Sequence, residues 1–378
     1  MAAPFTFGRI AVREDFVDRE QERARLVSNF AAGVNTSIIS PRRWGKSSLV
    51  AMAAQDAVAS TSTLKVCQID VFGARSEAEF YAQLASGVMR ATASRWQEWA
   101  ELARRFLGAL RPRVSFAPDP MQEVSLEFDW EEARRNPGEV LDLAERLAEA
   151  KGIRLVVAID EFQSVADFPD SLAFQRLLRS HWQRHQHVTY CLYGSKRHML
   201  TDIFGNPSMP FYRFGDILLL GKIDNEIWAE FIVRRFAETG KQISVADARD
   251  LASRVDNHSY YVQQLAQQVW FRAAPTADVA MVDDAFDSLR DQLSLQFVGL
   301  AESLTARQVR LLQAVVAGEA ELSAQATLKR YDLGTSANVT RMKEALANRE
   351  VIDFAGPSVQ ILDPMFAYWL RTELPGRL

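Results

Sequence analysis

The sequence predicts an α/β domain with a parallel sheet covered by helices on both faces, then an all-helical unit, then a winged helix-turn-helix unit. In the first half of the chain, short apolar runs alternate with helical segments, as a parallel sheet between two helical layers requires. The strand-like runs end near residue 222, and only helical spacing follows. From about residue 303, three helices and a short hairpin follow in the order of a winged helix.

The composition is that of a soluble globular protein. The chain has 378 residues, enough for two or three compact units, and 48% of them are apolar. Its net charge of -4 provides no overall attraction to nucleic acid, so a contact with DNA needs a local basic patch. Cys67 and Cys191 lie in apolar strand-like runs, which favours buried free thiols over a disulfide. There is no apolar stretch of membrane-spanning length and no signal-peptide pattern, so we expect a cytoplasmic protein without a membrane partner.

The first unit, residues 1–222, contains the predicted sheet. A Gly-Lys-Ser sequence opens the helix after the first strand, and a second helix follows the second strand. Two short β-type runs within residues 111–137 predict a small hairpin insertion. The predicted strands are residues 35–40, 63–73, 153–160 and 187–195.

The other two units are predicted from helix signals. Residues 223–300 form the all-helical unit, which we call the lid, and its first helix has a cap at Asp224 and a terminating glycine at Gly240. Residues 301–378 form the winged-helix unit, whose first helix has a cap at Thr305. Its third helix lies in the stretch SANVTRMKEALANR, and two short strands around a Gly-Pro turn complete the unit.

The stretch IISPRRWGKSSL, residues 38–49, predicts a phosphate-binding loop between the first strand and its helix. Backbone N–H groups around Gly45 would point at an anion held at the helix N-terminus. Lys46 would bring a positive charge to the β- and γ-phosphates, and the Ser47 hydroxyl would be a Mg²⁺ ligand. Ser40 stands where the pattern GxxxxGK[ST] has its first glycine, a change that removes no phosphate ligand. The alternative is a strand-helix junction in which the motif occurs by chance.

The other loop residues expected to contact nucleotide are Pro41, Arg42, Arg43, Trp44 and Ser48. The two arginines have more than one interpretation. They could neutralise phosphate or face a neighbouring copy of the chain, or they could be solvated residues paired with nearby acids. Trp44 could also pack against the lid or an adjoining domain.

Polar residues follow two other predicted strands. In IRLVVAIDEFQ, Asp160 would hold Mg²⁺ through water, and Glu161 would orient and deprotonate an attacking water. In LYGSKRHML, Ser195 would sense the γ-phosphate, although a plain turn residue is an equal alternative. Because the carboxyl ends of parallel strands meet at one edge of a sheet, these residues should converge on the phosphate loop.

Together with the opening FTFGRIAVREDFVDRE and the later PFYRFGDILLLGKI and HSYYVQQLA, these motifs resemble the prokaryotic AAA+-like ATPases of the STAND/MNS group, often called archaeal-type. The resemblance covers essentially the whole chain. It implies ATP and Mg²⁺ as ligands, with Phe16 and Arg19 beside the adenine. It also implies that Arg213 lies close to the nucleotide or acts on a neighbouring subunit as a catalytic residue.

One departure affects the lid. Relatives usually have Gly-His-Pro before the two tyrosines, whereas this chain has Asn257, His258 and Ser259. The lid element that normally reads the nucleotide state is therefore expected to be altered. Elsewhere, His181 and His185 share a helix face, but without a third ligand in that segment a structural role is favoured over a metal site.

The winged helix leaves two partners open. Arg330, Arg341 and Lys343 could form a local patch for DNA, but acidic residues nearly balance the basic ones across residues 303–378. A winged helix that docks on protein is an equal alternative.

The function predicted from these residues is Mg²⁺-dependent ATP hydrolysis that drives or times a conformational switch of lid and winged helix. The alternative is a nucleotide-gated DNA-binding regulator in which hydrolysis is slow or absent. A scaffold with a relic nucleotide pocket is a third interpretation, which the intact acidic pair disfavours. ATP and ADP are the expected ligands, and a homo-oligomer or another protein is the expected macromolecular partner.

Overall fold

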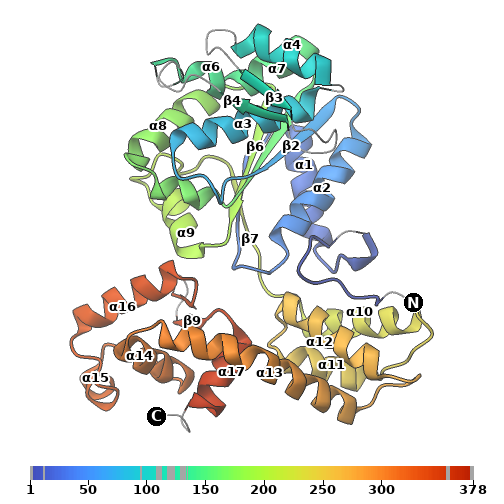
Figure 1. The fold of residues 1–378 in the computed structure, drawn as a ribbon, viewed down its shortest axis with the longest axis vertical. Coiled ribbons are helices and arrows are strands. Elements are labelled where there is room, and N and C mark those ends of the chain that lie inside the picture. Colours follow the sequence, from blue (N-terminus) through green and yellow to red (C-terminus); the bar gives the residue numbers. More distant parts are fainter. Residues whose placement is uncertain are drawn as a thin grey trace.

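The computed structural model describes residues 3–11, 13–93, 96–107, 113–116, 124–127, 133, 135–354 and 358–374. Figure 1 shows an α/β part and, below it, a helical part beside which both ends of the chain lie. The predicted fold class is confirmed: a parallel sheet between two helical layers is followed by helices and a winged helix.

A five-stranded sheet is the centre of the α/β part. Its strand order is β2-β5-β6-β1-β7, and every neighbouring pair is parallel. The carboxyl ends of all five strands therefore lie at one edge, where ligands bind in open α/β sheets. The strands are β1 (Thr36–Ile39), β2 (Leu64–Asp70), β5 (Arg154–Asp160), β6 (Val188–Gly194) and β7 (Asp216–Leu219).

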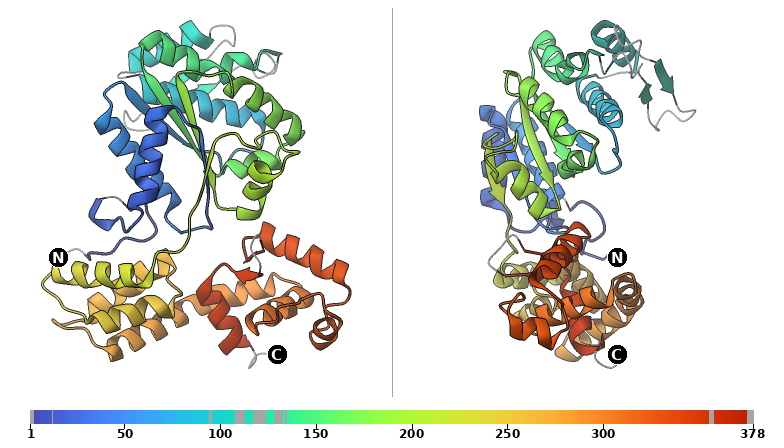
Figure 2. Two further views of the ribbon diagram at one scale, coloured as in Figure 1. Left: turned by 180° about the vertical axis from the view of Figure 1, so that it is seen from behind. Right: turned by 90° about the vertical axis from the view of Figure 1, so that its left-hand side faces the viewer.

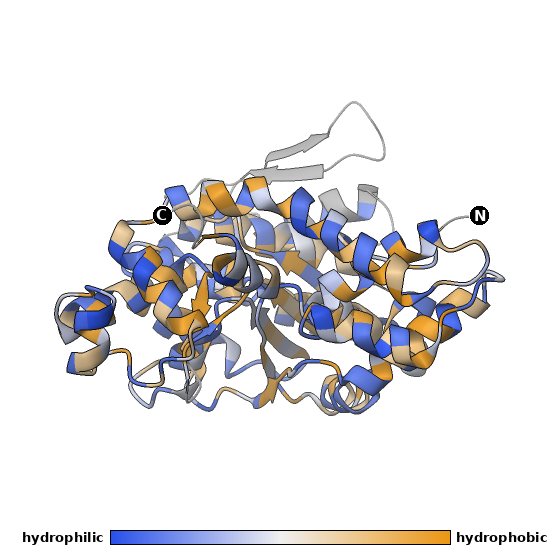
Figure 3. Cartoon of the chain, turned by 90° about the horizontal axis from the view of Figure 1, so that it is seen from below, coloured by the Kyte–Doolittle hydropathy of each residue, from blue (hydrophilic) through white to orange (hydrophobic). Residues whose placement is uncertain are grey.

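The burial of the strands follows from their place in the sheet. Every residue of β1 and β6 is buried, because both strands have neighbours on each side and helices on each face. The edge strands β2 and β7 contain exposed residues as well. Cys67 and Cys191 are buried and free, as predicted. Figure 3 shows largely hydrophobic strands enclosed by helices of mixed hydropathy.

Two hydrophobic clusters fix the helices to the sheet. Apolar residues of α1 (Glu20–Ala32) and α2 (Lys46–Ser60) pack on one face (Figure 2). The second cluster joins the opposite face to six further helices and a 3₁₀ turn. These are α3 (Glu77–Thr92), α4 (Trp96–Leu107), α6 (Gly138–Leu141), α7 (Leu143–Lys151), η3 (Phe162–Asp167), α8 (Ser171–Trp182) and α9 (Arg197–Gly205).

The predicted hairpin insertion is confirmed in its described strands. Strand β3 (Arg113–Phe116) pairs antiparallel with β4 (Val124–Glu127). Most of the other residues of the stretch 111–137 lie outside the described residues, as do residues 355–357, where the sequence predicts the Gly-Pro turn.

Four helices form the lid. They are α10 (Asn225–Ala237), α11 (Val245–Arg254), α12 (Ser259–Arg272) and α13 (Val279–Glu302). The side chain of Asp224 accepts a hydrogen bond from the Glu226 backbone, so the predicted cap is present. The first helix ends at Ala237, three residues before Gly240, whose φ is 71°.

The winged helix has one helix more than the sequence suggested. After α14 (Ala306–Val316), α15 (Gln325–Arg330) and α16 (Ser336–Asn348), strands β8 (Ile352–Asp353) and β9 (Gln360–Ile361) form the wing. A further helix, α17 (Pro364–Thr372), follows. The Asp363 carboxylate caps it by accepting hydrogen bonds from two backbone N–H groups.

The lid and the winged helix share a single hydrophobic core. It runs from Trp228 in α10 to Trp369 in α17, and α13 crosses the predicted boundary at residue 300. The N-terminal arm, residues 3–19, joins the same core: Phe5 packs its ring against Phe231 and Phe236. No helix among the described residues is long and apolar enough to cross a membrane.

Gly215 allows the chain to pass the start of β1 before it enters β7. A Cβ there would lie 2.0 Å from the carbonyl oxygen of Asn35, which also accepts a hydrogen bond from the Asp216 N–H. We expect Gly215→Ala to lower the free energy of unfolding by about 3 kcal/mol, measured by urea denaturation. Gly221→Ala is the matched control, because its Cβ would meet nothing within 4 Å. Equal stability of the two variants would contradict this close approach.

Candidate functional site

The phosphate loop leaves β1 at the carboxyl edge of the sheet and leads into α2. Gly45 immediately precedes the helix with a φ of 89°, a conformation that costs glycine little. Ser40 is fully buried, and its hydroxyl donates to the Pro41 carbonyl at 3.1 Å. The φ of Ser40 is not positive, so the missing first glycine removes no backbone conformation that this loop needs.

The acidic pair that ends β5 meets the start of α2. The Ser47 hydroxyl donates to the Asp160 carboxylate at 2.7 Å, and the Lys46 ammonium lies 3.4 Å from Glu161 Oε1. Lys46 is only 6% exposed, so its charge needs a buried partner. These four side chains come from segments more than a hundred residues apart in the sequence, and the structure brings them together.

Ser195 completes the cluster from the end of β6. Its hydroxyl lies 2.9 Å from Glu161 Oε2, and Gln163 donates to the same carboxylate oxygen. Strand β6 lies between β5 and β1 in the sheet, so its end falls between the phosphate loop and the acidic pair. Of the residues predicted as catalytic, Lys46, Asp160, Glu161 and Ser195 therefore gather at one edge.

The two carboxylates have opposite pKa shifts. Burial raises the pKa of Asp160, and the nearby Lys46 and Ser47 offset this only in part. Burial would also raise the pKa of Glu161, but Lys46 and the hydrogen bonds from Gln163 and Ser195 outweigh it and lower the pKa. Glu161 is thus held as a carboxylate, the form that can accept a proton from water.

The Ser47 hydroxyl and the Asp160 carboxylate fit a divalent ion. Both offer oxygen ligands, which Mg²⁺ prefers. The two oxygens lie 2.7 Å apart, so both could hold one ion, directly or through a bound water.

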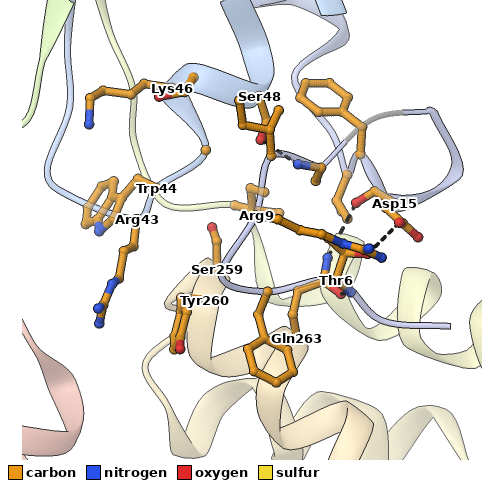
Figure 4. A pocket seen from close by; sticks show the side chains of 18 of the residues that line it. Thr6, Arg9, Asp15, Arg43, Trp44, Lys46, Ser48, Ser259, Tyr260 and Gln263 are labelled. Carbon is orange, nitrogen blue, oxygen red and sulfur yellow. Dashed lines mark hydrogen bonds between the residues drawn. The ribbon is translucent and has the colours of Figure 1, made fainter. Parts of the chain in front are cut away.

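A cavity of about 450 Å³ lies beside the loop (Figure 4). The N-terminal arm, the phosphate loop and the lid all contribute to its walls, which include aromatic side chains that suit a flat ring. In Figure 4 the Lys46 side chain points away from Thr6 and Gln263, and its ammonium lies beside Glu161. The predicted nucleotide contacts that line the cavity are Phe16, Arg19, Arg43, Trp44, Gly45, Lys46, Ser47 and Ser48.

Several predicted contacts are already engaged within the protein. Ser48 accepts a hydrogen bond from the Ala11 N–H at 3.0 Å, which holds the arm against α2. Arg19 is buried and pairs with Glu22 at 3.2 Å. The Arg43 guanidinium lies over the Tyr260 ring at 4.5 Å from its centroid. The loop is therefore tied to both the arm and the lid.

Pro41 and Arg42 do not line the cavity. Arg42 is 60% exposed at its side chain and pairs with Glu350 of the winged helix at 3.5 Å. Arg42 is therefore paired with an acid in this structure, which is one of the interpretations that the sequence left open. Glu350 was not recognised from the sequence, because it lies 155 residues after Ser195 and has no motif around it.

Arg213 lies at the opposite edge of the sheet. It comes three residues before β7, whose first residue aligns with the first residue of β1. The prediction that Arg213 is close to the nucleotide of its own chain is therefore wrong, because the phosphate loop follows the other end of β1. Arg213 is exposed and could reach a nucleotide only in a neighbouring copy.

The altered lid motif places His258 in a buried position. Its ring stacks at a tilt on Tyr261 with centroids 5.0 Å apart, and its Nδ1 has no hydrogen-bond partner among the described residues. Burial, and then the positive charges of Arg43 and Lys222, lower the pKa of His258 to about 3. The ring is neutral at physiological pH, and Ser259 rather than His258 lines the cavity.

We expect His258 to make the protein less stable in mild acid. The unfolded chain protonates this imidazole below about pH 6.5, whereas the folded chain does not, so the free energy of unfolding falls as pH decreases. Between pH 6.5 and 5 the loss should be about 2 kcal/mol, and His258→Gln should remove it. Urea denaturation of both proteins across this range measures the difference, and parallel pH profiles would contradict it.

The two spaced histidines on α8 and after it share a carboxylate. His181 Nδ1 and His185 Nε2 lie 2.8 and 2.9 Å from Asp142 Oδ1, and His185 Nδ1 lies 2.8 Å from the Tyr190 hydroxyl. The hydrogen bonds from the two histidines offset the burial of Asp142 and lower its pKa. The contacts join α8 and β6 to Asp142 and are structural in character.

The fold and the cluster define a class: a phosphate-loop ATPase fold with a helical lid and a C-terminal winged helix. A family model described as a probable winged helix domain matches residues 295–372. No curated protein matches the chain.

The solved structures that are similar over nearly the whole length include the following two. The Walker-type ATPase PABY2304 of Pyrococcus abyssi has 19% identity and a TM-score of 0.68, over 97% of this chain and 99% of that one. The ORC2 protein of Aeropyrum pernix, in its ADPNP-ADP complexes, has 15% identity and a TM-score of 0.58, over 99% of both chains. At these identities the likeness establishes the fold.

Proposed function

We propose that this protein binds ATP with Mg²⁺ and hydrolyses it. The observation that carries the proposal is the contact of the loop with the acidic residues at the end of β5. The Lys46 ammonium lies 3.4 Å from Glu161 Oε1, and the Ser47 hydroxyl lies 2.7 Å from Asp160 Oδ2. The neighbouring cavity, with its aromatic walls, would hold the adenine. The likeness in fold to a Walker-type ATPase agrees with this reading, and the motif resemblance to the STAND/MNS group remains a narrower prediction.

Each residue of the cluster has a role in this proposal. Lys46 would bind the β- and γ-phosphates, and the backbone N–H groups after Gly45 would bind their oxygens at the helix N-terminus. Ser47 and Asp160 would hold the metal, which neutralises developing phosphate charge. Glu161 would take a proton from the attacking water. Ser195, within hydrogen-bond distance of Glu161, would orient that water or bind the γ-phosphate.

The way the cavity is built supports a conformational switch as part of this proposal. Its walls come from the arm, the loop and the lid, so a bound nucleotide would fix these three segments relative to one another. Because the lid and the winged helix share one core, a movement of the lid would carry the winged helix with it. The exposed Arg213 supports a homo-oligomer as the assembly in which one copy completes the site of another.

The direct test is phosphate release by the purified chain with ATP. We expect release with Mg²⁺, none with EDTA, and a rise in melting temperature with ATP and Mg²⁺, because a ligand that binds only the folded chain stabilises it. The assay should be repeated with duplex DNA present. No release and no thermal shift under any of these conditions would exclude the proposal.

DNA binding is the second candidate, and the winged-helix match is the observation that favours it. The predicted basic patch is weaker than the sequence suggested, since Arg330 pairs with Glu319 at 2.6 Å and Lys343 lies over the Phe354 ring. Fluorescence anisotropy with duplex DNA at two salt concentrations, with and without ATP, is the test. Absence of binding at low salt in every nucleotide state would exclude a DNA-binding regulator.

A further inference from the structure

The winged helix contacts the edge of the sheet that holds the acidic cluster. Glu350 follows α16 with a φ of 55° and points its carboxylate at two residues of the site. Glu350 Oε1 lies 2.6 Å from the Ser195 hydroxyl, and Glu350 Oε2 lies 3.5 Å from the Arg42 guanidinium. Its side chain is only 18% exposed. A carboxylate from the C-terminal unit therefore lies beside the residue proposed to meet the third phosphate.

Polar contacts around Glu350 hold the two parts together. Arg197, the first residue of α9, pairs with Asp353 at 2.9 Å, and His198 Nε2 lies 3.0 Å from Asn348 Oδ1. The His198 ring also stacks on Phe354 with centroids 5.9 Å apart. In Figures 1 and 2 the C-terminal unit approaches the α/β part at this place, with one end of α16 facing α9. A contact made of a few polar pairs can separate at modest cost.

Two carboxylates compete for one hydroxyl group in this contact. The single proton of the Ser195 hydroxyl can be donated to only one acceptor, yet Glu161 and Glu350 both lie within hydrogen-bond distance of it. Lys46 is the cation beside Glu161, and Arg42 is the cation beside Glu350. Any further negative charge placed between Lys46 and Arg42 would compete with Glu350 for both the hydroxyl and the guanidinium.

ATP and ADP differ in just such a charge. A lysine of a phosphate loop contacts the β- and γ-phosphates, so the third phosphate would lie near Lys46 on the side of Ser195. A diphosphate ends before this point. Like charges brought this close in a partly buried site are strongly unfavourable.

We propose that Glu350 makes the site discriminate between di- and triphosphate: it remains bound to Ser195 and Arg42 when ADP is present, and the third phosphate of ATP displaces it. The inference rests on the proposed nucleotide binding. It adds a residue that lowers the affinity for ATP and leaves the affinity for ADP unchanged. Displacement would break the contact of α9 with α16 and free the end of α16. Glu350 is thus a specificity-determining residue that links phosphate number to the position of the winged helix.

Calorimetric titration of the full chain with ADP and with a non-hydrolysable ATP analogue, both with Mg²⁺, tests the proposal. In Glu350→Gln the Kd for the analogue should fall about tenfold, while the Kd for ADP should not change. Arg197→Gln weakens the contact without touching the loop. It should also lower the Kd for the analogue relative to the Kd for ADP. Glu344→Gln removes the same charge from an exposed position of α16 and is the matched control.

Hydrogen exchange tests whether Glu350 responds to the third phosphate, which a purely structural role would not require. In the unaltered chain, the ATP analogue should raise the exchange of backbone amides in residues 349–353, and ADP should not. Equal Kd ratios in Glu350→Gln and the unaltered chain would overturn the inference alone. Failure of the unaltered chain to bind either nucleotide would overturn the proposed function as well, so the two failures are distinguishable.

Discussion

Replacing Glu161 by glutamine is expected to lower the rate of ATP hydrolysis by about 10²- to 10³-fold while ATP still binds. The amide keeps the size of the side chain but cannot accept a proton from water. The lowered pKa of Glu161 means that the native residue is a carboxylate at neutral pH, so the loss should be of similar size from pH 6 to 8. Phosphate release under saturating ATP, beside calorimetric titration with the analogue, separates the rate from the affinity.

Glu344→Gln is again a suitable control, because it makes the same chemical change on an exposed face of α16. Its rate should equal that of the unaltered chain. Turnover by Glu161→Gln at the native rate would show that another group accepts the proton, and the proposed role of Glu161 would have to be withdrawn.

Lys46→Ala should weaken ATP binding by about 10²-fold or more. The ammonium is buried against Glu161, so its removal takes away the charge that would bind phosphate and leaves a buried carboxylate without its cation. The pKa of Glu161 should then rise, since Lys46 is the largest influence that opposes burial there. Calorimetric titration with ATP and Mg²⁺ measures the affinity, and circular dichroism checks that the variant is folded.

Lys65→Ala serves as the comparison for the loss of a positive charge. Lys65 is exposed on the edge strand β2, outside the cluster, and its removal should leave the affinity unchanged. If Lys46→Ala bound ATP as tightly as Lys65→Ala, the loop would not be the phosphate site.

The elements of the site could be predicted because their signals are local. A strand followed by Gly45 and Lys46 determines a loop and a helix start over a few residues, and the acidic pair at the end of β5 follows directly from the apolar run before it. Their meeting could also be predicted, since parallel strands carry their ends to one edge. The order of the strands was not predicted, because it depends on which pairs form in the folded sheet.

Other features depend on contacts that no local pattern encodes. The family resemblance implies that Arg213 lies close to the nucleotide or to a neighbouring subunit, and only the register of β7 against β1 shows that it lies at the far edge of the sheet. The shared core of lid and winged helix arises from apolar residues spread over more than a hundred positions, each of which would suit a separate domain equally well. The partner of the two histidines, Asp142, precedes His181 by 39 residues.

By itself, the sequence determined a parallel sheet, a lysine-bearing loop, an acidic strand end and a winged helix, because backbone propensity and apolar spacing act over a few residues. Only the tertiary structure decided that Glu350 lies against Ser195, that Arg42 is its cation and that His258 is buried away from the cavity. Those contacts join segments remote in sequence, and they form where packing and charge pairing across the whole molecule bring the segments together.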